Sequence, residues 1–453
     1  MIKKFSVLIN KKIEKFNNTI SPPGDKSISN RFFFIASQAV GVSTAEGILE
    51  GEDVLNNIKI FKQLGVKIIK KNKIYYVYGN GLKSLKTKEN LKIYAGNAGT
   101  VARCIMGLLV PYLESINISG DSSLSRRDFY RCIEPLEKFG CSFYPKGKTT
   151  LPLKMKGTDW LLPLNNYELK YPSAQVKTCC IFASLMTPGI STIIEPLKLA
   201  SRTHTEILLK YIGADIKVKK NKNFNLIKVK GLNDFKAFDL KVPGDTSAAA
   251  FFIALATLNK DSKIKIVNVN LNPFRTGFIN LIKKMGGKIL IKNKKKVCGE
   301  KKGNIIIRSA NLRSINCPAS MATKMIDEYP IAMLCAAKAK GVSNFYGLDE
   351  LNKKESKRLD VCNNFLNQIG IKTKLGKNKI KIYGNPNLQL NKSYVINTYK
   401  DHRIAKMAFV AAQTLVMKGS VTIKNFENVN TSFPEFLKLM KKCNCKYEIK
   451  KNN

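Results

Sequence analysis

The chain lacks several features, and each absence excludes a class of protein. No apolar run approaches the roughly 18 residues of a membrane-spanning helix, which argues against an integral membrane protein. The eleven cysteines include no Cys-x2-Cys pair, and the close pairs Cys179-Cys180 and Cys443-x-Cys445 suit neither a zinc site nor a disulfide framework. Residues 1–8 alternate like a strand and contain no apolar stretch of the signal-peptide kind. We therefore expect a globular, cytoplasmic protein with reduced thiols and no membrane association.

Acidic residues are also few, 32 against 78 basic ones, and the net charge is +46. Such a balance is typical of proteins that bind nucleic acid or anionic membranes. The lysines, however, occur among asparagine and isoleucine, as in residues 219–222 (KKNK) and 292–296 (KNKKK). Joint enrichment in these three residue types is what a compositional drift of the genome produces. We favour that interpretation and expect no nucleic-acid partner.

Arginine is scarce within this excess of positive charge, because only 11 of the 78 basic residues are arginine. Where lysine is the default cation, a retained arginine indicates a task that needs its planar, bidentate fork. Seven arginines fall in the segments discussed below: Arg31, Arg103, Arg127, Arg202, Arg275, Arg358 and Arg403. Their grouping points to a small ligand with several negative charges.

A repeat runs through the 453 residues, which are too many for one ordinary core. Six helical stretches each end in an apolar residue followed by Gly or Asn, and a strand-like run comes next. The Gly or Asn positions are Gly65, Gly140, Gly213, Gly286, Gly370 and Asn444, at intervals of 75, 73, 73, 84 and 74 residues. These residue types suit a helix end where the chain takes positive φ. We infer six copies of one α/β unit.

A second repeat divides the six copies into two halves. The sequence Pro-Gly-Asp at residues 23–25 returns at residues 243–245, and each time a Ser and an apolar helix follow. Asp and Ser at this place are good N-terminal caps. The pattern predicts two similar domains, one of residues 23–242 and one of residues 243–453 together with residues 1–22. A ligand is expected in the cleft between them.

The first half supplies groups that bind anions. Residues 23–31 (PGDKSISNR) place Lys26 and Arg31 at a helix start, where exposed backbone N–H groups also favour an anion, although an ordinary capped helix would look similar. Residues 94–103 (YAGNAGTVAR) form a turn of small residues that lets backbone amides approach a phosphate closely, or simply a tight turn. The pair at residues 126–127 (RR) either faces the same ligand or is solvated.

Hydroxyl and amide groups follow, and then acids. Residues 171–177 (YPSAQVK) carry neutral groups that suit ring hydroxyls, and residues 201–204 (SRTH) pair a hydroxyl with an arginine. In the second half, Asp327, Glu355 and Asp401 lie on three separate segments. Each of these carboxylates alone is more often a cap or a surface charge. Together, cations in one half and carboxylates in the other indicate an enzyme that holds anions and moves protons.

These segments resemble the 5-enolpyruvylshikimate-3-phosphate synthase family (3-phosphoshikimate 1-carboxyvinyltransferases), in the same order and across nearly the whole chain. The matching motifs are PGDKSISNR, GNAGTVAR, YPSAQVK, SRTHTE, VPGDTSAAAFF, NPFRTG, IDEYP, KKESKR, TYKDHRIA and TSFPEF. The resemblance implies an α/β fold of two similar domains, each of three inverse α/β units, with the active site in the interdomain cleft. It also implies a monomer whose partners are two small molecules, shikimate 3-phosphate and phosphoenolpyruvate, and a reaction that needs no metal or cofactor.

The resemblance assigns residues to roles. It implies Lys26, Asp327 and Glu355 as catalytic residues. For shikimate 3-phosphate it implies Lys26, Ser27, Arg31, Ser173, Ala174, Gln175, Ser201, Arg202, Asp327 and Lys354. For phosphoenolpyruvate it implies Lys26, Gly99, Arg103, Arg127, Gln175, Arg358 and Arg403. The sequence leaves open whether Lys26 or Glu355 protonates C3 of phosphoenolpyruvate.

Some positions depart from the family pattern. Asp128 stands where many relatives have Pro, and Thr431 stands where some carry a lysine that contacts phosphoenolpyruvate. These two changes affect expected affinity rather than reaction type. The nearest rival is the sister enzyme that transfers enolpyruvate to UDP-N-acetylglucosamine. That enzyme has a Lys-Asn turn and a loop Cys acting as acid, whereas this chain has Lys26-Ser27 and no Cys in a matching loop.

Overall fold

The structure is a computed structural model that describes residues 4–451, and the chain divides into two compact units. The first, here called the N unit, consists of Gly24–Val242 and Lys296–Glu300. The second, the C unit, holds the described residues up to Pro23, Pro243–Lys295 and those from Lys301 onward. Each unit has its own cluster of buried apolar side chains. No helix between residues 4 and 451 is long and apolar enough to cross a membrane.

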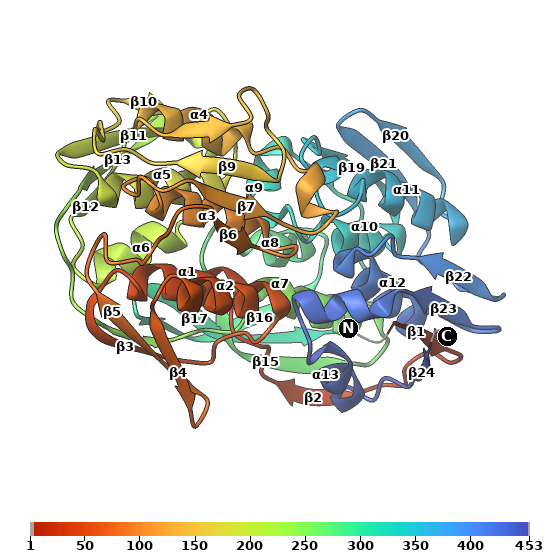
Figure 1. Ribbon diagram of the computed structural model, residues 1–453. Helices are drawn as coiled ribbons and strands as arrows, with labels where there is room; N and C mark the ends of the chain where they lie inside the picture. The colour runs from red at the N-terminus through yellow and green to blue at the C-terminus, as the bar shows by residue number, and fades with distance from the viewer. Residues whose placement is uncertain (1–3, 452–453) are drawn as a thin grey trace. The chain divides into compact units, whose positions relative to one another are not determined.

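The N unit contains three four-stranded sheets of one pattern (Figure 1). One sheet has the order β6-β7-β9-β8, in which β6 and β7 are parallel and the other pairs antiparallel. Its elements are β6 (Leu91–Tyr94), α3 (Gly99–Leu108), β7 (Ile116–Ser119), η1 (Leu124–Arg126), α4 (Tyr130–Lys138), β8 (Ser142–Tyr144) and β9 (Leu153–Lys156). The next sheet repeats the order with β10 (Tyr167–Glu168), α5 (Ala174–Met186), β11 (Ile190–Pro196), η2 (Leu197–Leu199), α6 (His204–Tyr211), β12 (Ile216–Lys220) and β13 (Phe224–Lys230).

The remaining sheet of the N unit has the order β14-β3-β5-β4. It is built with α1 (Lys26–Ala36), β3 (Val40–Glu46), α2 (Glu52–Gln63), β4 (Lys67–Lys71), β5 (Ile74–Asn80) and β14 (Asp239–Lys241). Strand β14, which pairs with β3 in parallel, thus comes from the end of the segment Gly24–Val242. Strand β2 (Asn17–Ile20), which directly precedes α1, pairs with β15 of the C unit instead. The connections at residues 23–24 and 242–243 therefore each follow a strand that belongs to the sheet of the unit being left.

The C unit repeats the same pattern three times. Its first sheet uses β2, α7 (Thr246–Leu258), β15 (Lys263–Asn270), α8 (Gly277–Lys284), β16 (Lys288–Val297) and β17 (Glu300–Arg308). Its second uses β18 (Asn316–Cys317), η3 (Ala319–Met321), α9 (Ala322–Met325), α10 (Tyr329–Ala337), β19 (Gly341–Tyr346), η4 (Leu351–Lys353), α11 (Arg358–Gln368), β20 (Thr373–Gly376) and β21 (Lys379–Gly384). Its third uses β22 (Tyr394–Asn397), α12 (His402–Leu415), β23 (Val421–Lys424), η5 (Phe426–Thr431), α13 (Phe436–Lys442) and β24 (Glu448–Lys451).

The third sheet of the C unit is completed by the start of the chain. Strand β1 (Phe5–Ile9) lies between β23 and β24, in the order β22-β23-β1-β24. Val7 is the register partner of Ile423 on one side and of Ile449 on the other. The red strand β1 accordingly lies beside the blue strands β23 and β24 in Figure 1.

The six predicted helix ends are confirmed by the backbone. Gly65, Gly140, Gly213, Gly286 and Gly370 have φ of 83°, 104°, 81°, 92° and 86°, and Asn444 has φ of 65°. Each follows a helix at the expected point and leads toward the outer strands of its own sheet. The prediction of six α/β copies is confirmed as well, because the described residues form six four-stranded sheets of matching strand order.

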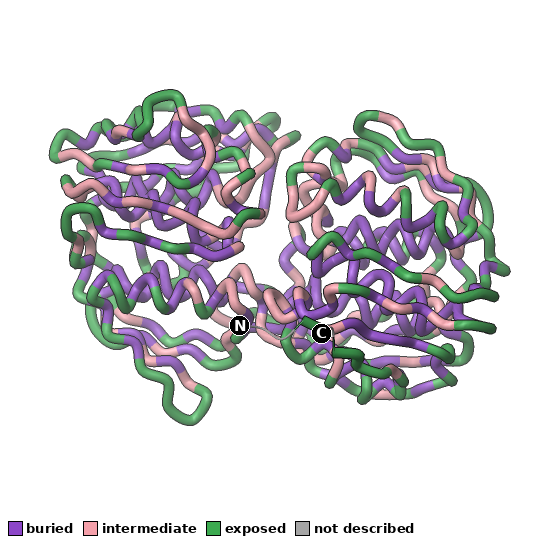
Figure 2. Tube along the Cα trace, turned by 45° about the vertical axis from the view of Figure 1, so that its right-hand side comes forward, coloured by how far each residue is buried: buried purple, intermediate pink, exposed green. Residues whose placement is uncertain are grey.

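Helices form the interior of each unit and sheets form its outside. Nearly every residue of α5, α7, α10 and α12 is buried, whereas strands such as β5 alternate between buried and less buried positions. Figure 2 shows the helical turns of both units in purple and the strand edges largely in green or pink. Helix starts are therefore the points where polar side chains can leave an apolar core.

Candidate functional site

The first predicted anion-binding turn lies in the N unit at the start of α1. Asp25 caps the helix by accepting from the backbone N–H groups of Ser27 at 2.8 Å and Ile28 at 3.1 Å, as predicted. Lys26, the first helical residue, places Nζ 2.8 Å from Oδ2 of Asp53 on α2. The two side chains keep 24% and 15% of their surface exposed, so the ammonium lies at the unit's surface. The sequence did not predict Asp53 as its partner.

Arg31 points into the N unit rather than away from it. It is 3% exposed, and burial lowers the pKa of its guanidinium. Nε donates to Oγ1 of Thr205 at 2.8 Å, and Nη2 donates to Oγ1 of Thr178 at 3.0 Å. Nη1 donates to the carbonyl oxygen of Ser27 at 3.0 Å. Arg31 therefore ties α1 to α5 and α6 and fixes the first turn of α1.

Four of the residues predicted for phosphoenolpyruvate lie together in the N unit. A Cβ built on Gly99, at the start of α3, would lie 3.0 Å from Nη1 of both Arg103 and Arg127. Arg103 donates from Nη1 to Oε1 of Gln175 at 2.9 Å and from Nη2 to the carbonyl oxygen of Asp128 at 2.9 Å. We call Gly99, Arg103, Arg127 and Gln175 the arginine cradle.

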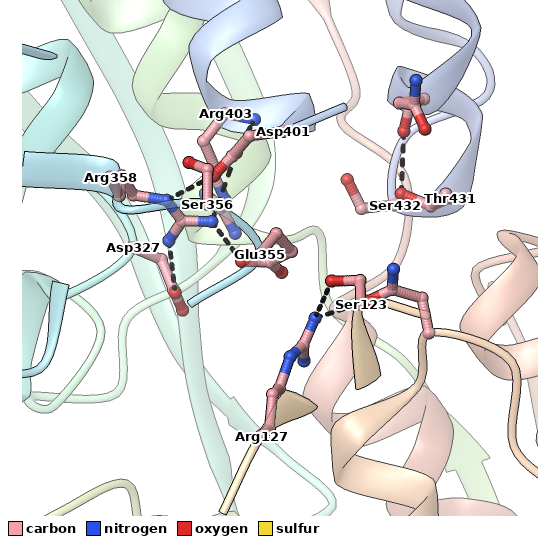
Figure 3. A network of polar contacts seen from close by, with 12 residues as sticks. Ser123, Arg127, Asp327, Glu355, Ser356, Arg358, Asp401, Arg403, Thr431 and Ser432 are labelled. Atoms are coloured by element: carbon pink, nitrogen blue, oxygen red, sulfur yellow. Dashed lines mark hydrogen bonds and ion pairs between the residues drawn. The ribbon is translucent and has the colours of Figure 1, made fainter. Parts of the chain in front are cut away.

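Neighbouring side chains hold the arginine cradle in place. The guanidinium of Arg103 lies 4.5 Å from the ring centroid of Phe129, and burial lowers its pKa. Arg127 donates from Nη2 to Oδ1 of Asn97 and, at 3.3 Å, to Oγ of Ser123 (Figure 3). Asp128, the departure from the family pattern, turns its carboxylate to the backbone N–H of Tyr130 at 2.9 Å. That carboxylate therefore helps to start α4.

The predicted hydroxyl and amide groups occupy helix starts of the N unit. Ser173 caps α5, and its Oγ accepts from the backbone N–H of Val176 at 3.4 Å; Ala174 is the first residue of that helix. Gln175 also donates from Nε2 to Oγ1 of Thr100 at 2.9 Å. Ser201 precedes α6 and is buried, whereas Arg202 next to it is partly exposed.

The acids of the C unit gather around one arginine. Arg358, the first residue of α11, is 1% exposed, and its Nε donates to Oδ2 of Asp401 at 2.9 Å. Its Nη2 donates to Oε2 of Glu355 and, at 3.3 Å, to Oδ1 of Asp401. Its Nη1 lies 3.7 Å from Oδ1 of Asp327. Figure 3 shows the three carboxylates around this guanidinium, and we call the four residues the Arg358 cluster.

The members of the Arg358 cluster differ in exposure. The side chains of Asp327 and Glu355 keep 19% and 21% of their surface exposed, whereas Asp401 is fully buried. Burial alone would lower the pKa of Arg358. The surrounding carboxylates, Asp401 and Glu355 foremost, outweigh burial and raise that pKa above its ordinary value. The guanidinium is therefore a permanent cation that holds two partly exposed carboxylates.

Other predicted residues of the C unit lie beside this cluster or elsewhere in the unit. The backbone N–H of Arg403 donates to Oδ1 of Asp401 at 2.8 Å, and its Nη1 lies 3.5 Å from Oε1 of Glu328. Lys354 directly precedes Glu355. Arg275 departs from the expectation that the motif arginines serve a ligand, because its Nη2 lies 2.8 Å from Oδ1 of Asp245 and the pair is buried. It supports the second Pro-Gly-Asp turn.

A lysine side chain lies close to Thr431, the position where some family members carry a lysine. Thr431 donates to the carbonyl oxygen of Asn428 at 2.8 Å and brings no cation. Lys406 on α12 donates from Nζ to Oγ of the next residue, Ser432, at 3.3 Å. The same ammonium lies 4.8 Å from the ring centroid of Phe251. The ammonium of Lys406 on α12 thus lies beside the residue that follows Thr431.

The sequence did not reveal the side chains that hold the predicted site residues in place. Asp53, Asp401 and the buried Lys177 were not assigned roles, although Asp401 and Lys177 lie inside quoted motifs. The first turn of α2 gave no signal for Asp53, since Glu and Asp are common at helix starts. Among residues 4–451, no group of three or more His, Cys, Asp or Glu side chains is arranged to hold a metal ion.

Comparison with known proteins gives a consistent result. The family model described as EPSP synthase (3-phosphoshikimate 1-carboxyvinyltransferase) matches residues 10–440. The 3-phosphoshikimate 1-carboxyvinyltransferase of Zymomonas mobilis is 36% identical over 98% of this chain and 97% of its own length. The enzyme of the same name from Vesicomyosocius okutanii is 38% identical, over 92% and 93% of the two chains.

Solved structures agree in fold. An EPSP synthase from Acinetobacter baumannii has a TM-score of 0.85 and 31% identity, and covers 98% of this chain and 100% of its own. The enolpyruvyl transferase NikO from Streptomyces tendae, at 14% identity and a TM-score of 0.76, shares the fold. The mixed α/β fold expected from the sequence is therefore confirmed. From its match to the family model and its identity to these relatives, the chain belongs to the EPSP synthase (3-phosphoshikimate 1-carboxyvinyltransferase) family.

Proposed function

We infer that this chain transfers the enolpyruvyl group of phosphoenolpyruvate to the 5-hydroxyl of shikimate 3-phosphate and releases phosphate, a step of the shikimate pathway that leads to aromatic amino acids. The observation that carries this function is the match to one enzyme family over residues 10–440, with the motif residues present. The arginine cradle and the Arg358 cluster support it, because they supply fixed cations and carboxylates in the two units.

The proposed role of the N unit is to bind anions. Phosphoenolpyruvate carries a carboxylate and a phosphate, and the tetrahedral ketal formed from both substrates carries two phosphates and a carboxylate. Fixed cations that do not need to reorganise are the strongest stabilisers of such charge. Arg103 and Arg127, held on either side of Gly99, are suited to this task. Lys26, partly exposed, is proposed to contact both substrates.

The proposed role of the Arg358 cluster is proton transfer. Asp327 acts as base and removes the proton of the 5-hydroxyl while the hydroxyl oxygen attacks C2 of phosphoenolpyruvate. C3 gains a proton, from Glu355 or from Lys26, and the ketal forms. In the second step the group that protonated C3 takes one proton back from it, the bond between C2 and the phosphate oxygen breaks, and the phosphate leaves with the proton held by Asp327, which restores the double bond. Arg358 holds Glu355 and Asp327 in place and is itself fixed by the buried Asp401.

The proposed binding residues are those expected from the motifs. For shikimate 3-phosphate they are Lys26, Ser27, Arg31, Ser173, Ala174, Gln175, Ser201, Arg202, Asp327 and Lys354. For phosphoenolpyruvate they are Lys26, Gly99, Arg103, Arg127, Gln175, Arg358 and Arg403. For Arg31 we propose a supporting contact through the first turn of α1, since its three donor nitrogens already bind Thr205, Thr178 and Ser27.

Phosphate release from phosphoenolpyruvate in the presence of shikimate 3-phosphate tests the proposal. Lys26→Ala and Glu355→Ala should each lower kcat by about 100-fold or more, the usual effect of removing a proton-transfer group. Lys70→Ala and Glu14→Ala remove one side of exposed ion pairs in the same units and serve as matched controls. Release that is independent of shikimate 3-phosphate, or equally fast with UDP-N-acetylglucosamine, would contradict the function.

We further propose that the protein is a cytoplasmic monomer without a nucleic-acid or membrane partner. The placement of arginines in substrate motifs, rather than along one basic stripe, supports a small anionic ligand. Light scattering after size-exclusion chromatography should give the mass of one chain. Binding to DNA at physiological ionic strength that weakens steeply with added salt would argue against the proposal.

A further inference from the structure

A buried ion triad lies in the N unit behind the segment that carries Ser201 and Arg202. Lys177 on α5 is completely buried, and its Nζ lies 2.8 Å from Oε1 of Glu195 at the end of β11. It also lies 2.7 Å from Oε1 of Glu206 in the first turn of α6. Removing three charges from water is costly, and a buried ion pair is a weak source of stability compared with apolar packing. Stability alone therefore does not explain why the chain contains this triad.

The triad holds Ser201 by all of its polar atoms. The backbone N–H and the hydroxyl of Ser201 each lie 3.0 Å from Oε1 of Glu195. The carbonyl oxygen of Ser201 accepts from Nζ of Lys177 at 3.2 Å. Glu195 is fixed from its other side, because Oε2 accepts from Nδ2 of Asn225 at 3.0 Å. The position of Ser201 is thus set by Lys177 and Glu195.

The hydroxyl of Ser201 is the group that the triad can release. Oε1 of Glu195 receives three donors, the Ser201 N–H, the Ser201 hydroxyl and the Lys177 ammonium. One carboxylate oxygen offers about two lone-pair positions, so the three contacts compete. A hydroxyl rotates about one bond, whereas the backbone and the ammonium are held elsewhere. The hydroxyl can therefore turn to a ligand oxygen while the backbone of Ser201 stays in place.

The charge state of Lys177 supports this arrangement. Burial alone would lower the pKa of its ammonium, but the carboxylates of Glu206 and Glu195 outweigh burial and raise that pKa. Lys177 therefore remains a cation. Glu206 supplies the second negative charge, while its neighbour Thr205 accepts from Arg31 at 2.8 Å.

We propose that Lys177 and Glu195 are positioning residues that set Ser201, and with it the start of the Arg202 side chain, for the phosphate group of shikimate 3-phosphate. This inference rests on the proposed function and on the assignment of Ser201 and Arg202 to that substrate. Neither Lys177 nor Glu195 touches the reacting atoms. Their loss therefore weakens binding of one substrate and leaves the chemical step and the other substrate unaffected.

A double variant with unchanged net charge tests the inference. Lys177→Met with Glu206→Gln removes one cation and one anion together, and it takes away the Lys177 contact with the Ser201 carbonyl. We expect KM for shikimate 3-phosphate to rise about tenfold, the range of one lost charged hydrogen bond. Both kcat and the KM for phosphoenolpyruvate should stay within about twofold of their wild-type values. Glu206→Gln alone keeps every Ser201 contact and should change no parameter more than about twofold.

Further variants separate positioning from folding. Ser201→Ala should raise the same KM, and adding it to the charge-matched double variant should raise that KM by less than the product of the two separate effects, because both changes act in part through the Ser201 hydroxyl. Phe61→Leu, a cavity variant in the core of the same unit, should lower thermal stability without this selective effect. If the double variant does not fold, Asn225→Ala, which loosens Glu195, should give a smaller rise in the same KM.

Two results would overturn the inference: a rise in KM of similar size for both substrates, or a fall in kcat with unchanged KM values. A wild-type chain that releases no phosphate with shikimate 3-phosphate would instead refute the proposed function. The two failures are therefore distinguishable.

Discussion

The arginines show at the scale of single residues why a lysine-rich chain keeps a few of them. Arg358 contacts Asp401, Glu355 and Asp327 through different nitrogen atoms of one planar group. A lysine ammonium is a point charge on a flexible stem and could not hold three carboxylates in fixed directions. The arginines of the motifs therefore occupy positions of specific geometry, and Arg275, in a structural turn, is one of them.

Arg358→Lys is predicted to lower kcat although the charge is retained. The change removes the fork that fixes Glu355 and Asp327, so we expect a loss of about 100-fold, the scale of a misplaced proton-transfer group. Steady-state kinetics on purified protein measures it. Arg308→Lys, at an exposed position of β17, is the matched control and should behave like wild type. Equal activity of the two variants would contradict the role of the Arg358 cluster.

Gly99→Ala is predicted to weaken phosphoenolpyruvate binding selectively. The added methyl would lie 3.0 Å from the guanidinium groups of Arg103 and Arg127, which is closer than most real contacts, so both arginines must shift. We expect KM for phosphoenolpyruvate to rise about tenfold, comparable to weakening one charged hydrogen bond. Binding of shikimate 3-phosphate alone, followed by calorimetry, should be unchanged. A parallel loss of both affinities would show that the cradle serves both substrates.

The two Pro-Gly-Asp turns show at the scale of elements how one scaffold was used twice. Asp25 and Asp245 each accept from two backbone N–H groups at the start of a buried helix. In the N unit the turn continues with Lys26, which reaches the surface and Asp53. In the C unit the corresponding residue is Thr246, and Asp245 is bound instead by the buried Arg275. The second turn therefore serves structure.

Asp245→Ala is predicted to destabilise the protein more than Asp25→Ala. Either change removes a helix cap, at a cost of about 1 kcal/mol. Asp245→Ala also takes a carboxylate away from the buried Arg275, which costs about 3 kcal/mol or more. Urea unfolding should therefore show the lower midpoint for Asp245→Ala. A similar midpoint for the two variants would show that Arg275 finds another partner at little cost.

Local features of the sequence were predictable, and contacts between distant segments were not. The positive φ at Gly65 and the caps at Asp25 and Asp245 follow from a few neighbouring residues, so the pattern revealed them. The Lys26–Asp53 pair and the three carboxylates on Arg358 depend on how helices pack, which no short motif encodes. The motif resemblance supplied residues for a site, but the groups that hold them required the structure.

Strand exchange is the main feature at the scale of the whole molecule. Strand β2 pairs in the C unit although α1 follows it, and β14 pairs in the N unit although α7 follows it. The six sheets are therefore not six consecutive segments, even though the repeat of about 75 residues can be read from the sequence. The sequence pattern identifies the copies, and only pairing shows which strand each copy receives from elsewhere.

Val7→Pro is predicted to disturb the C unit and leave the N unit intact. Val7 lies in a central strand with register partners on both sides, and proline cannot donate to the ladder. Amide hydrogen exchange should accelerate in β23 and β24, while β6 to β9, in a separate core, should keep their protection. Uniform acceleration across both units would show that they unfold as one.

The place of β1 has a consequence for the order in which the protein forms on the ribosome. This strand is made before its partners β23 and β24, which follow more than 400 residues later. All strands of the three N-unit sheets lie within Gly24–Val242 and leave the ribosome well before that point. The N unit can therefore pair its strands during translation, whereas the third sheet of the C unit must wait until β24 has been made. Strand β1 can therefore join its sheet only long after its own synthesis.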